Sequence, residues 1–299
     1  MKLRVGTRGS RLATAQAGEV AARLGALGVE AELVPIETSG DRGAPAADSP
    51  FGLKGLFVAE IVRALLDGGV DVAVHSAKDL PAVDDPGVVL GATPPRARPF
   101  DVLVRHQTEM AEDAVVGTSS LRRRAQLLHS RPRLRVHELR GNVDTRLAKL
   151  DAGEVDALVL AEAGLSRLGV TPRFQTPLYA DEMVPAPGQG ALAIQAREGD
   201  EETLRVLRVL DHAETRAAVE AERALMARLG GGCALPLGAY AVARERMVHL
   251  IAIVASPDGV RLVRAESREQ GPERAAEAAA ERLLAQGAGE ILDAVRREG

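Results

Sequence analysis

Short apolar runs alternate with helical patterns of apolar and polar residues over the first 80 positions. The turn after the first apolar run ends at Ser10, which stands where a helix N-cap would stand. The pattern predicts strands over Leu3–Val5, Ala31–Thr38 and Val70–Val74, and helices over Leu12–Leu24 and Leu56–Leu66. Strands and helices that alternate in this way predict an α/β fold with a mostly parallel sheet.

Two segments recur in the same order in the two halves of the chain. VGTRGSRLATAQ, which begins at Val5, resembles VGTSSLRRRAQ from Val116, and LDGGVDVAV from Leu66 resembles LDAGEVDALV from Leu150. Strand-turn-helix units can resemble each other by chance, but two matches in register favour an internal duplication. The sequence therefore predicts twin α/β lobes with a ligand-binding cleft between them.

The pattern changes near Asp211. A long helical segment leads to GGGCALPLG, and strand-like segments flanking a turn at Pro257–Gly259 are followed by helices rich in Glu, Ala and Arg. This predicts a third, smaller α+β domain, although a length of 299 residues alone would suggest two domains at roughly 150 residues each.

Composition narrows the functional classes. Hydrophobic residues make up 46% of the chain at a mean hydropathy of −0.03, and no apolar run approaches the roughly 20 residues of a membrane helix. The first residues lack the apolar stretch of a signal peptide, and a single cysteine suits a reducing compartment, so we expect a cytoplasmic protein. A net charge of −4 and 2% aromatic residues argue against a nucleic-acid binder.

Arginine, hydroxyl and amide side chains gather directly after predicted strands. They form three clusters: Arg8 with Ser10; Thr118, Ser119, Ser120, Arg122 and Arg123; and Arg140, Asn142, Thr145 and Arg146. Backbone N–H groups and the helix dipole favour anions at a strand-to-helix turn, and arginine binds carboxylate or phosphate through two donors. A single arginine is more often a surface cation, but three clusters at equivalent turns favour an anionic ligand.

Two further positions could carry chemistry. Asp79 ends a predicted buried strand, where a carboxylate could stabilise a cation or transfer a proton, and Lys78 beside it could bind an acidic group. Equally, Asp79 could simply cap the next helix. Cys233 follows three glycines and is well placed to attach something covalently, although a lone thiol is usually buried and inert. His75 has no second ligand at metal-binding spacing, so no metal site is expected.

Seven motifs in order resemble the porphobilinogen deaminase (hydroxymethylbilane synthase) family over essentially the whole chain. They are TRGSRLA, GLKGLF, DVAVHSAKDLP, VGTSSLRR, LRGNVDTRLAKL, VPAPGQGA and GGCALPLG. The sequence departs from the family pattern at Arg11, where proline is common, and at Leu53, where glycine is usual. The resemblance implies two lobes similar to type II periplasmic binding proteins, residues 1–92 with 190–210 and residues 93–189, and a cofactor-anchoring domain over residues 211–299.

The resemblance also implies an activity. Such an enzyme condenses four porphobilinogen molecules head to tail with release of ammonia, then hydrolyses off linear hydroxymethylbilane for tetrapyrrole and haem biosynthesis. The chain grows on a dipyrromethane cofactor, here joined by a thioether to Cys233. Asp79 matches the catalytic aspartate, which would hold pyrrole N–H groups and stabilise the cation left when ammonia departs. Each pyrrole carries an acetate and a propionate, which the arginine clusters suit.

Further site residues follow from the same resemblance. Those implied at the cofactor are Ser76, Lys78, Asp79, Thr118, Ser120, Arg122, Arg123, Gly141 and Arg146. Those implied at the substrate are Arg8, Ser10, Gln16, Arg140, Arg146, Arg167 and Gln189. The long segment before the second helix, ending at Lys54 and Phe57, would be a lid over the site. A monomer is expected, with neither nucleic acid nor membrane as partner.

Two other functions remain possible from the residues alone. A non-catalytic anion-binding protein on a twin-lobe fold would use the same arginine clusters, but the missing signal peptide and the glycine-cysteine turn speak against it. A nucleic-acid binder could use Arg122, Arg123 and Arg124, but the acidic net charge and the scarcity of aromatic residues weaken that alternative.

Overall fold

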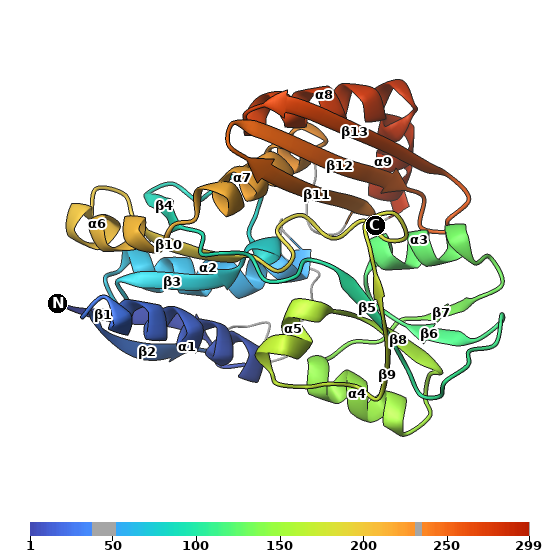
Figure 1. Ribbon diagram of the computed structural model, residues 1–299, viewed down its shortest axis with the longest axis horizontal. Helices are drawn as coiled ribbons and strands as arrows, with labels where there is room; N and C mark the ends of the chain where they lie inside the picture. The colour runs from blue at the N-terminus through green and yellow to red at the C-terminus, as the bar shows by residue number, and fades with distance from the viewer. Residues whose placement is uncertain (38–51, 231–234, 299) are drawn as a thin grey trace.

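The computed structural model describes residues 1–37, 52–230 and 235–298, with side chains described from residue 58 onward in the second range and up to residue 297 in the third. Three β-sheets organise this part of the chain (Figure 1). Two of them have five strands each and the third has three. We call the two five-stranded sheets with their helices the first and second lobes, and the three-stranded sheet with its helices the third domain.

The first lobe has the strand order β2-β1-β3-β10-β4. Its strands are β1 (Lys2–Arg8), β2 (Glu30–Ile36), β3 (Val72–Ser76), β4 (Val88–Ala92) and β10 (Leu192–Arg197). Its helices are α1 (Arg11–Ala26), α2 (Gly52–Leu66), α6 (Glu201–Leu210) and the short 3₁₀ turn η2 (Ala77–Asp79). The predicted elements are confirmed with shifted ends, since β3 runs two residues further than expected and α2 begins four residues earlier.

The second lobe repeats this topology with the order β7-β6-β8-β5-β9. Its strands are β5 (Asp101–Arg105), β6 (Val115–Gly117), β7 (Arg135–His137), β8 (Ala157–Ala161) and β9 (Phe174–Leu178), and its helices are α3 (Leu121–Ser130), α4 (Val143–Asp151) and α5 (Glu162–Arg167). The repeated sequence segments occupy equivalent places in the two lobes. The first segment spans β1 and α1 in the first lobe and β6 and α3 in the second. The other segment leads into β3 in the first lobe and into β8 in the second. The predicted duplication into two similar α/β lobes is confirmed.

The expectation of mostly parallel sheets is confirmed for four of the five strands in each lobe. In the first lobe β2, β1, β3 and β4 run in the same direction, as do β7, β6, β8 and β9 in the second, but β10 and β5 run antiparallel to both of their neighbours. The physical reason is connectivity, because β10 enters the first sheet from the second lobe and β5 enters the second sheet from the first lobe. Neither arrives through the strand-helix-strand crossover that makes neighbouring strands parallel.

Two crossing segments, residues 93–100 and 179–191, join the lobes and pack against each other (Figure 1). The Ala97 N–H donates to the Gly190 carbonyl over 3.3 Å. Gly190 has φ +85°, and a Cβ atom added there would lie 2.6 Å from the Ala97 oxygen. Glycine is therefore required at this contact between the two crossing segments.

The third domain contains α7 (Ala213–Arg228), β11 (Leu237–Arg244), β12 (Met247–Ala255), β13 (Leu262–Gln270), α8 (Pro272–Ala285) and α9 (Ala288–Glu298). Its strands form an antiparallel sheet in the order β11-β12-β13, as expected for an α+β unit. Fully buried alanines on α8, including Ala275 and Ala279, form part of the core between this sheet and its helices. Helix α7 lies between this sheet and the first lobe (Figure 1), so residues of the third domain can reach the first lobe. No described helix is both long and apolar enough to cross a membrane.

Candidate active site

Each of the three clusters lies at a strand-to-helix turn, as the sequence predicts. Ser10 Oγ accepts from the Ala13 N–H at the start of α1, over 3.3 Å. Ser120 Oγ accepts from the Arg123 N–H at 3.4 Å, and Asn142 Oδ1 accepts from the Thr145 N–H at 2.9 Å. These residues are the N-caps of α1, α3 and α4. The turns therefore present helix N-termini, which favour anions.

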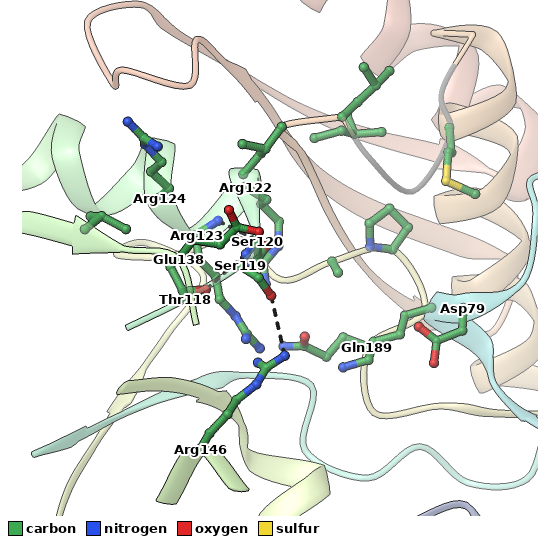
Figure 2. Close-up of a pocket in the computed structure, with 18 residues that line it drawn as sticks. Asp79, Thr118, Ser119, Ser120, Arg122, Arg123, Arg124, Glu138, Arg146 and Gln189 are labelled. Carbon is green, nitrogen blue, oxygen red and sulfur yellow. Dashed lines mark hydrogen bonds between the residues drawn. The ribbon is translucent and has the colours of Figure 1, made fainter. Parts of the chain in front are cut away.

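A cavity of about 560 Å³ lies where the two lobes and the third domain meet. It is lined by Lys78, Asp79, Thr118, Ser119, Ser120, Leu121, Arg122, Arg123, Arg124, Val136, Glu138, Arg146, Ala186, Pro187, Gln189, Met226, Leu235 and Leu237. Figure 2 shows Asp79 on the first-lobe side and the arginines on the second-lobe side. Five of these side chains are cationic and two are carboxylates, so the lining is strongly basic.

A smaller cavity of about 70 Å³ lies within the first lobe. Its lining is Arg8, Ser10, Leu12, Ala13, Gln16, Val58, Ile61, Val74, His75, Ser76 and Asp79. The Gln16 Nε2 donates to Ser76 Oγ over 2.8 Å, which joins α1 to the end of β3. Asp79 is half-buried and lines both cavities, so this residue lies where the two cavities approach each other.

Asp101 neutralises part of the positive charge beside the larger cavity. Its fully buried carboxylate pairs with Arg122 Nη2 at 2.8 Å and with Arg123 Nη2 at 2.7 Å. Burial alone would raise the pKa of Asp101, but the two guanidinium groups outweigh burial and hold that pKa well below its usual value. One carboxylate balances only one of two buried cations, which leaves a positive charge beside the cavity.

Arg146 adds a second uncompensated cation. Its Nε donates to the Gly141 carbonyl at 2.8 Å and its Nη2 to Ser119 Oγ at 3.4 Å, the dashed line of Figure 2. Among the residues that the structure describes, no carboxylate lies within ion-pair distance of Arg146. Burial, helped by repulsion from Arg123, lowers the pKa of Arg146 to about 10. The side chain stays protonated at neutral pH, and an anionic ligand would stabilise it.

Gln189 contributes a buried acceptor to the same cavity. Its Nε2 donates to the Pro99 carbonyl at 2.7 Å and to Asp101 Oδ1 at 2.9 Å, which fixes the orientation of the amide. Within the described part of the chain its Oε1 has no donor, although the residue is 1% exposed. A buried acceptor without a donor is costly, so a ligand N–H would fit here.

Several residues implied by the family resemblance lie away from the larger cavity's lining. Ser76 lies at the smaller cavity, and Gly141 contributes only its carbonyl, to Arg146. Arg140 is exposed and pairs with Glu138 at 2.7 Å, while Arg167 Nε pairs with Glu19 Oε2 at 3.1 Å across the two lobes. Cys233 lies outside the described residues, as do the side chains of Leu53, Lys54 and Phe57.

His75 is a packed residue of the smaller cavity. It is 5% exposed, and burial lowers the pKa of its imidazole to about 4, so the ring is neutral at pH 7. No group of three or more His, Cys, Asp or Glu side chains with metal-binding geometry occurs among the residues described.

Sequence reasoning missed Asp101 as a site residue. Asp101 opens the apolar strand DVLV, and a carboxylate at the start of a buried strand is a weak signal for a buried ion pair. Its partners Arg122 and Arg123 lie about twenty positions further along, and no spacing rule relates the two segments.

Two family models match this chain. "Porphobilinogen deaminase, dipyromethane cofactor binding domain" matches residues 3–205, and "Porphobilinogen deaminase, C-terminal domain" matches residues 216–285. The chain belongs to the porphobilinogen deaminase family. Enzymes of this family are transferases of tetrapyrrole biosynthesis that use a dipyrromethane cofactor, and this chain is one of them.

Curated porphobilinogen deaminases are similar to this chain over nearly its whole length. The protein from Desulforudis audaxviator is 52% identical and that from Syntrophotalea carbinolica is 46% identical, each over 98% of this chain and over 97% and 96% of their own lengths. Among solved structures, a periplasmic substrate-binding protein of an ABC transporter from Coxiella burnetii is 17% identical over 70% of this chain and 91% of its own, with a TM-score of 0.42.

Proposed function

We propose that Asp79 is the catalytic carboxylate of this porphobilinogen deaminase and that it works at the junction of two binding sites. The observation that carries this proposal is that Asp79 lines both cavities. The larger, basic cavity would hold the cofactor and the growing chain. The smaller cavity, lined by Arg8, Ser10 and Gln16, would receive part of the incoming porphobilinogen.

The chemistry of the larger cavity fits a dipyrromethane. Two pyrroles, each with an acetate and a propionate, carry four carboxylates, and the lining holds more cations than described carboxylates can balance. The residues that would hold the group are Lys78, Thr118, Ser120, Arg122, Arg123 and Arg146. The buried Gln189 Oε1 offers an acceptor for a ring N–H. When bound, the cofactor supplies the nucleophilic terminal ring on which elongation starts.

The proposed anchor of the cofactor is Cys233, the one cysteine of the sequence. Leu235, two residues further on, lines the larger cavity. Two residues of extended chain span at most about 7 Å, so the sequence position of Cys233 is compatible with a thioether at this cavity.

Asp79 would act by electrostatic stabilisation. Loss of ammonia from porphobilinogen leaves a positive charge next to the ring, and a fixed, half-buried carboxylate lowers the energy of that charge. The neighbouring Lys78 would bind a substrate or chain carboxylate. Arg140, at the exposed rim, and Arg167, between the lobes, would bind carboxylates of later rings, and Lys54 and Phe57 would belong to a lid.

We propose that the protein acts as a monomer, since its two lobes and its third domain together line the proposed cofactor cavity. We also propose the domain division into residues 1–92 with 190–210, 93–189 and 211–299, because these ranges collect the strands of the three sheets. The single cysteine supports a reducing, cytoplasmic location, and the net charge of −4 supports small-molecule rather than nucleic-acid partners. Light scattering on the purified protein tests the monomer.

Intact-protein mass spectrometry combined with kinetics tests the assignment of the site. We expect an adduct of two condensed pyrroles in the unaltered protein and its loss in Cys233→Ser. Asp79→Ala should keep its fold and lower turnover roughly 100-fold or more, as removal of a preorganised electrostatic group does. An unmodified Cys233 in active enzyme, or substantial turnover in Asp79→Ala, would show that these residues are misassigned.

A further inference from the structure

Helix α7 of the third domain holds the chain on both sides of the turn that carries Lys78 and Asp79. Two adjacent residues of this helix, Glu222 and Arg223, make the contacts, and both are buried. The turn itself is a short 3₁₀ segment closed by one bond, from the Leu80 N–H to the Ala77 carbonyl at 3.2 Å. Such a turn has little rigidity of its own, so its surroundings must fix its position.

On one side, Glu222 holds the crossing segment against the turn. Its Oε2 accepts from the Gly188 N–H at 2.6 Å. Gly188 has φ +73°, and a Cβ atom added there would lie 2.8 Å from both Ala77 C and Lys78 N. The crossing segment therefore rests directly on the backbone of the turn, at a distance only glycine allows.

On the other side, Arg223 holds the chain that leaves the turn. Its Nη2 donates to the Pro81 carbonyl at 3.0 Å and to Asp84 Oδ1 at 2.8 Å. Asp84 Oδ1 also accepts from Gln195 Nε2 of β10 at 2.9 Å, which ties the same loop to the first sheet. Arg223 thus holds Pro81 and Asp84, two of the five residues that follow Asp79.

We propose that Arg223 is a positioning residue for Asp79: by holding Pro81 and Asp84 it keeps the Asp79 carboxylate between the two cavities. This inference rests on the proposed catalytic role of Asp79. Arg223 itself lines neither cavity, and so it acts only through the turn. Helix α7 ends at Arg228, five residues before Cys233, so one helix joins the proposed cofactor anchor to the catalytic turn.

The test compares Arg223→Met with Arg216→Met in the cofactor-loaded enzyme. Arg216 is a matched control, since it lies two turns earlier on α7, pairs with Asp211 at 2.7 Å and donates to the Leu90 carbonyl of the first lobe at 3.1 Å. Arg223→Met should lower kcat about tenfold to a hundredfold, as a carboxylate displaced by about 1 Å would, with KM changed less than about twofold. Arg223→Lys should restore part of kcat, and Arg216→Met should leave kcat and KM near their original values.

A double variant separates positioning from general destabilisation. Asp79→Glu already displaces the carboxylate by one methylene, so adding Arg223→Met should cost much less than it does alone. The proposal is overturned if the losses of kcat caused by Asp79→Glu and Arg223→Met multiply in the double variant. It is also overturned if Arg216→Met lowers kcat as much as Arg223→Met does. Should Arg223→Met fail to fold, Asp84→Asn is measured in the same way, with the same outcomes. Full turnover in Asp79→Ala would instead overturn the proposed function, whatever Arg223 does.

Discussion

Arg96 and Glu222 form a two-pronged ion pair at the junction of the crossing segment and the third domain, with N–O distances of 2.7 and 3.1 Å. They are 126 residues apart, and the Glu222 side chain has no exposed surface. Its carboxylate also accepts from the Gly188 and Ala241 N–H groups, at 2.6 and 2.7 Å. One buried carboxylate therefore joins both crossing segments to β11 of the third domain.

Glu222→Gln should strongly destabilise the fold, because it leaves the Arg96 guanidinium buried without its counter-charge. We expect a loss of about 3–5 kcal/mol in the free energy of unfolding, measured by urea denaturation. The matched control is Glu290→Gln, which breaks the exposed ion pair with Arg261 and should cost no more than about 1 kcal/mol. Equal losses in the two variants would contradict this view of Glu222.

Asp101→Asn should destabilise the protein in a pH-dependent manner. Since the folded-state pKa of Asp101 is lowered, its contribution is fully present above the unfolded-state value of about 3.9 and is lost as the pH falls below it. The variant should be about 3–5 kcal/mol less stable at pH 7, and the difference should narrow at pH 3. Urea denaturation at both pH values checks this, and a constant difference would contradict the lowered pKa of Asp101 in the folded state.

His75 should make the protein less stable as the pH falls from about 6.5 to about 4. Burial lowers its pKa to about 4, and Asp79 and Asp84 only partly oppose this, so the unfolded chain binds the proton more tightly. The contribution is present above pH 6.5 and amounts to at most about 3 kcal/mol when lost. His75→Gln should flatten the curve of unfolding free energy against pH in that interval, and an unchanged slope would contradict the prediction.

Arg146→Leu should impair binding more than folding. The guanidinium has no carboxylate partner among the described residues, so we expect the unfolding free energy to change by less than about 1 kcal/mol. A lost charge-assisted contact of about 1.5–3 kcal/mol predicts a fall of about tenfold or more in kcat/KM for porphobilinogen. Arg140→Leu should have a smaller effect, because that side chain is 71% exposed and already pairs with Glu138. Steady-state kinetics measure the effect of each variant on kcat/KM, and thermal melting measures its effect on stability.

Much of the fold follows from local pattern. The turns capped by Ser10, Ser120 and Asn142 could be predicted because an N-cap, a strand and an amphipathic helix are each coded within about ten residues. The repeated segments indicated twin lobes for the same reason. The direction of β5 and β10 could not be predicted, since each enters its sheet from the other lobe and local sequence does not record a strand's neighbours.

The sequence by itself determined the strand-end clusters, the cysteine, the family and hence the chemistry, because these are properties of short segments and of their order. Only the tertiary structure decided how their charges are balanced. It placed Asp101 beside Arg122 and Arg123, left Arg146 without a described carboxylate, and put Asp79 between two cavities. It also brought Arg223 to Asp84, 139 residues away. Such pairings depend on which surfaces meet when the lobes and the third domain pack, and residue spacing along the chain does not encode them.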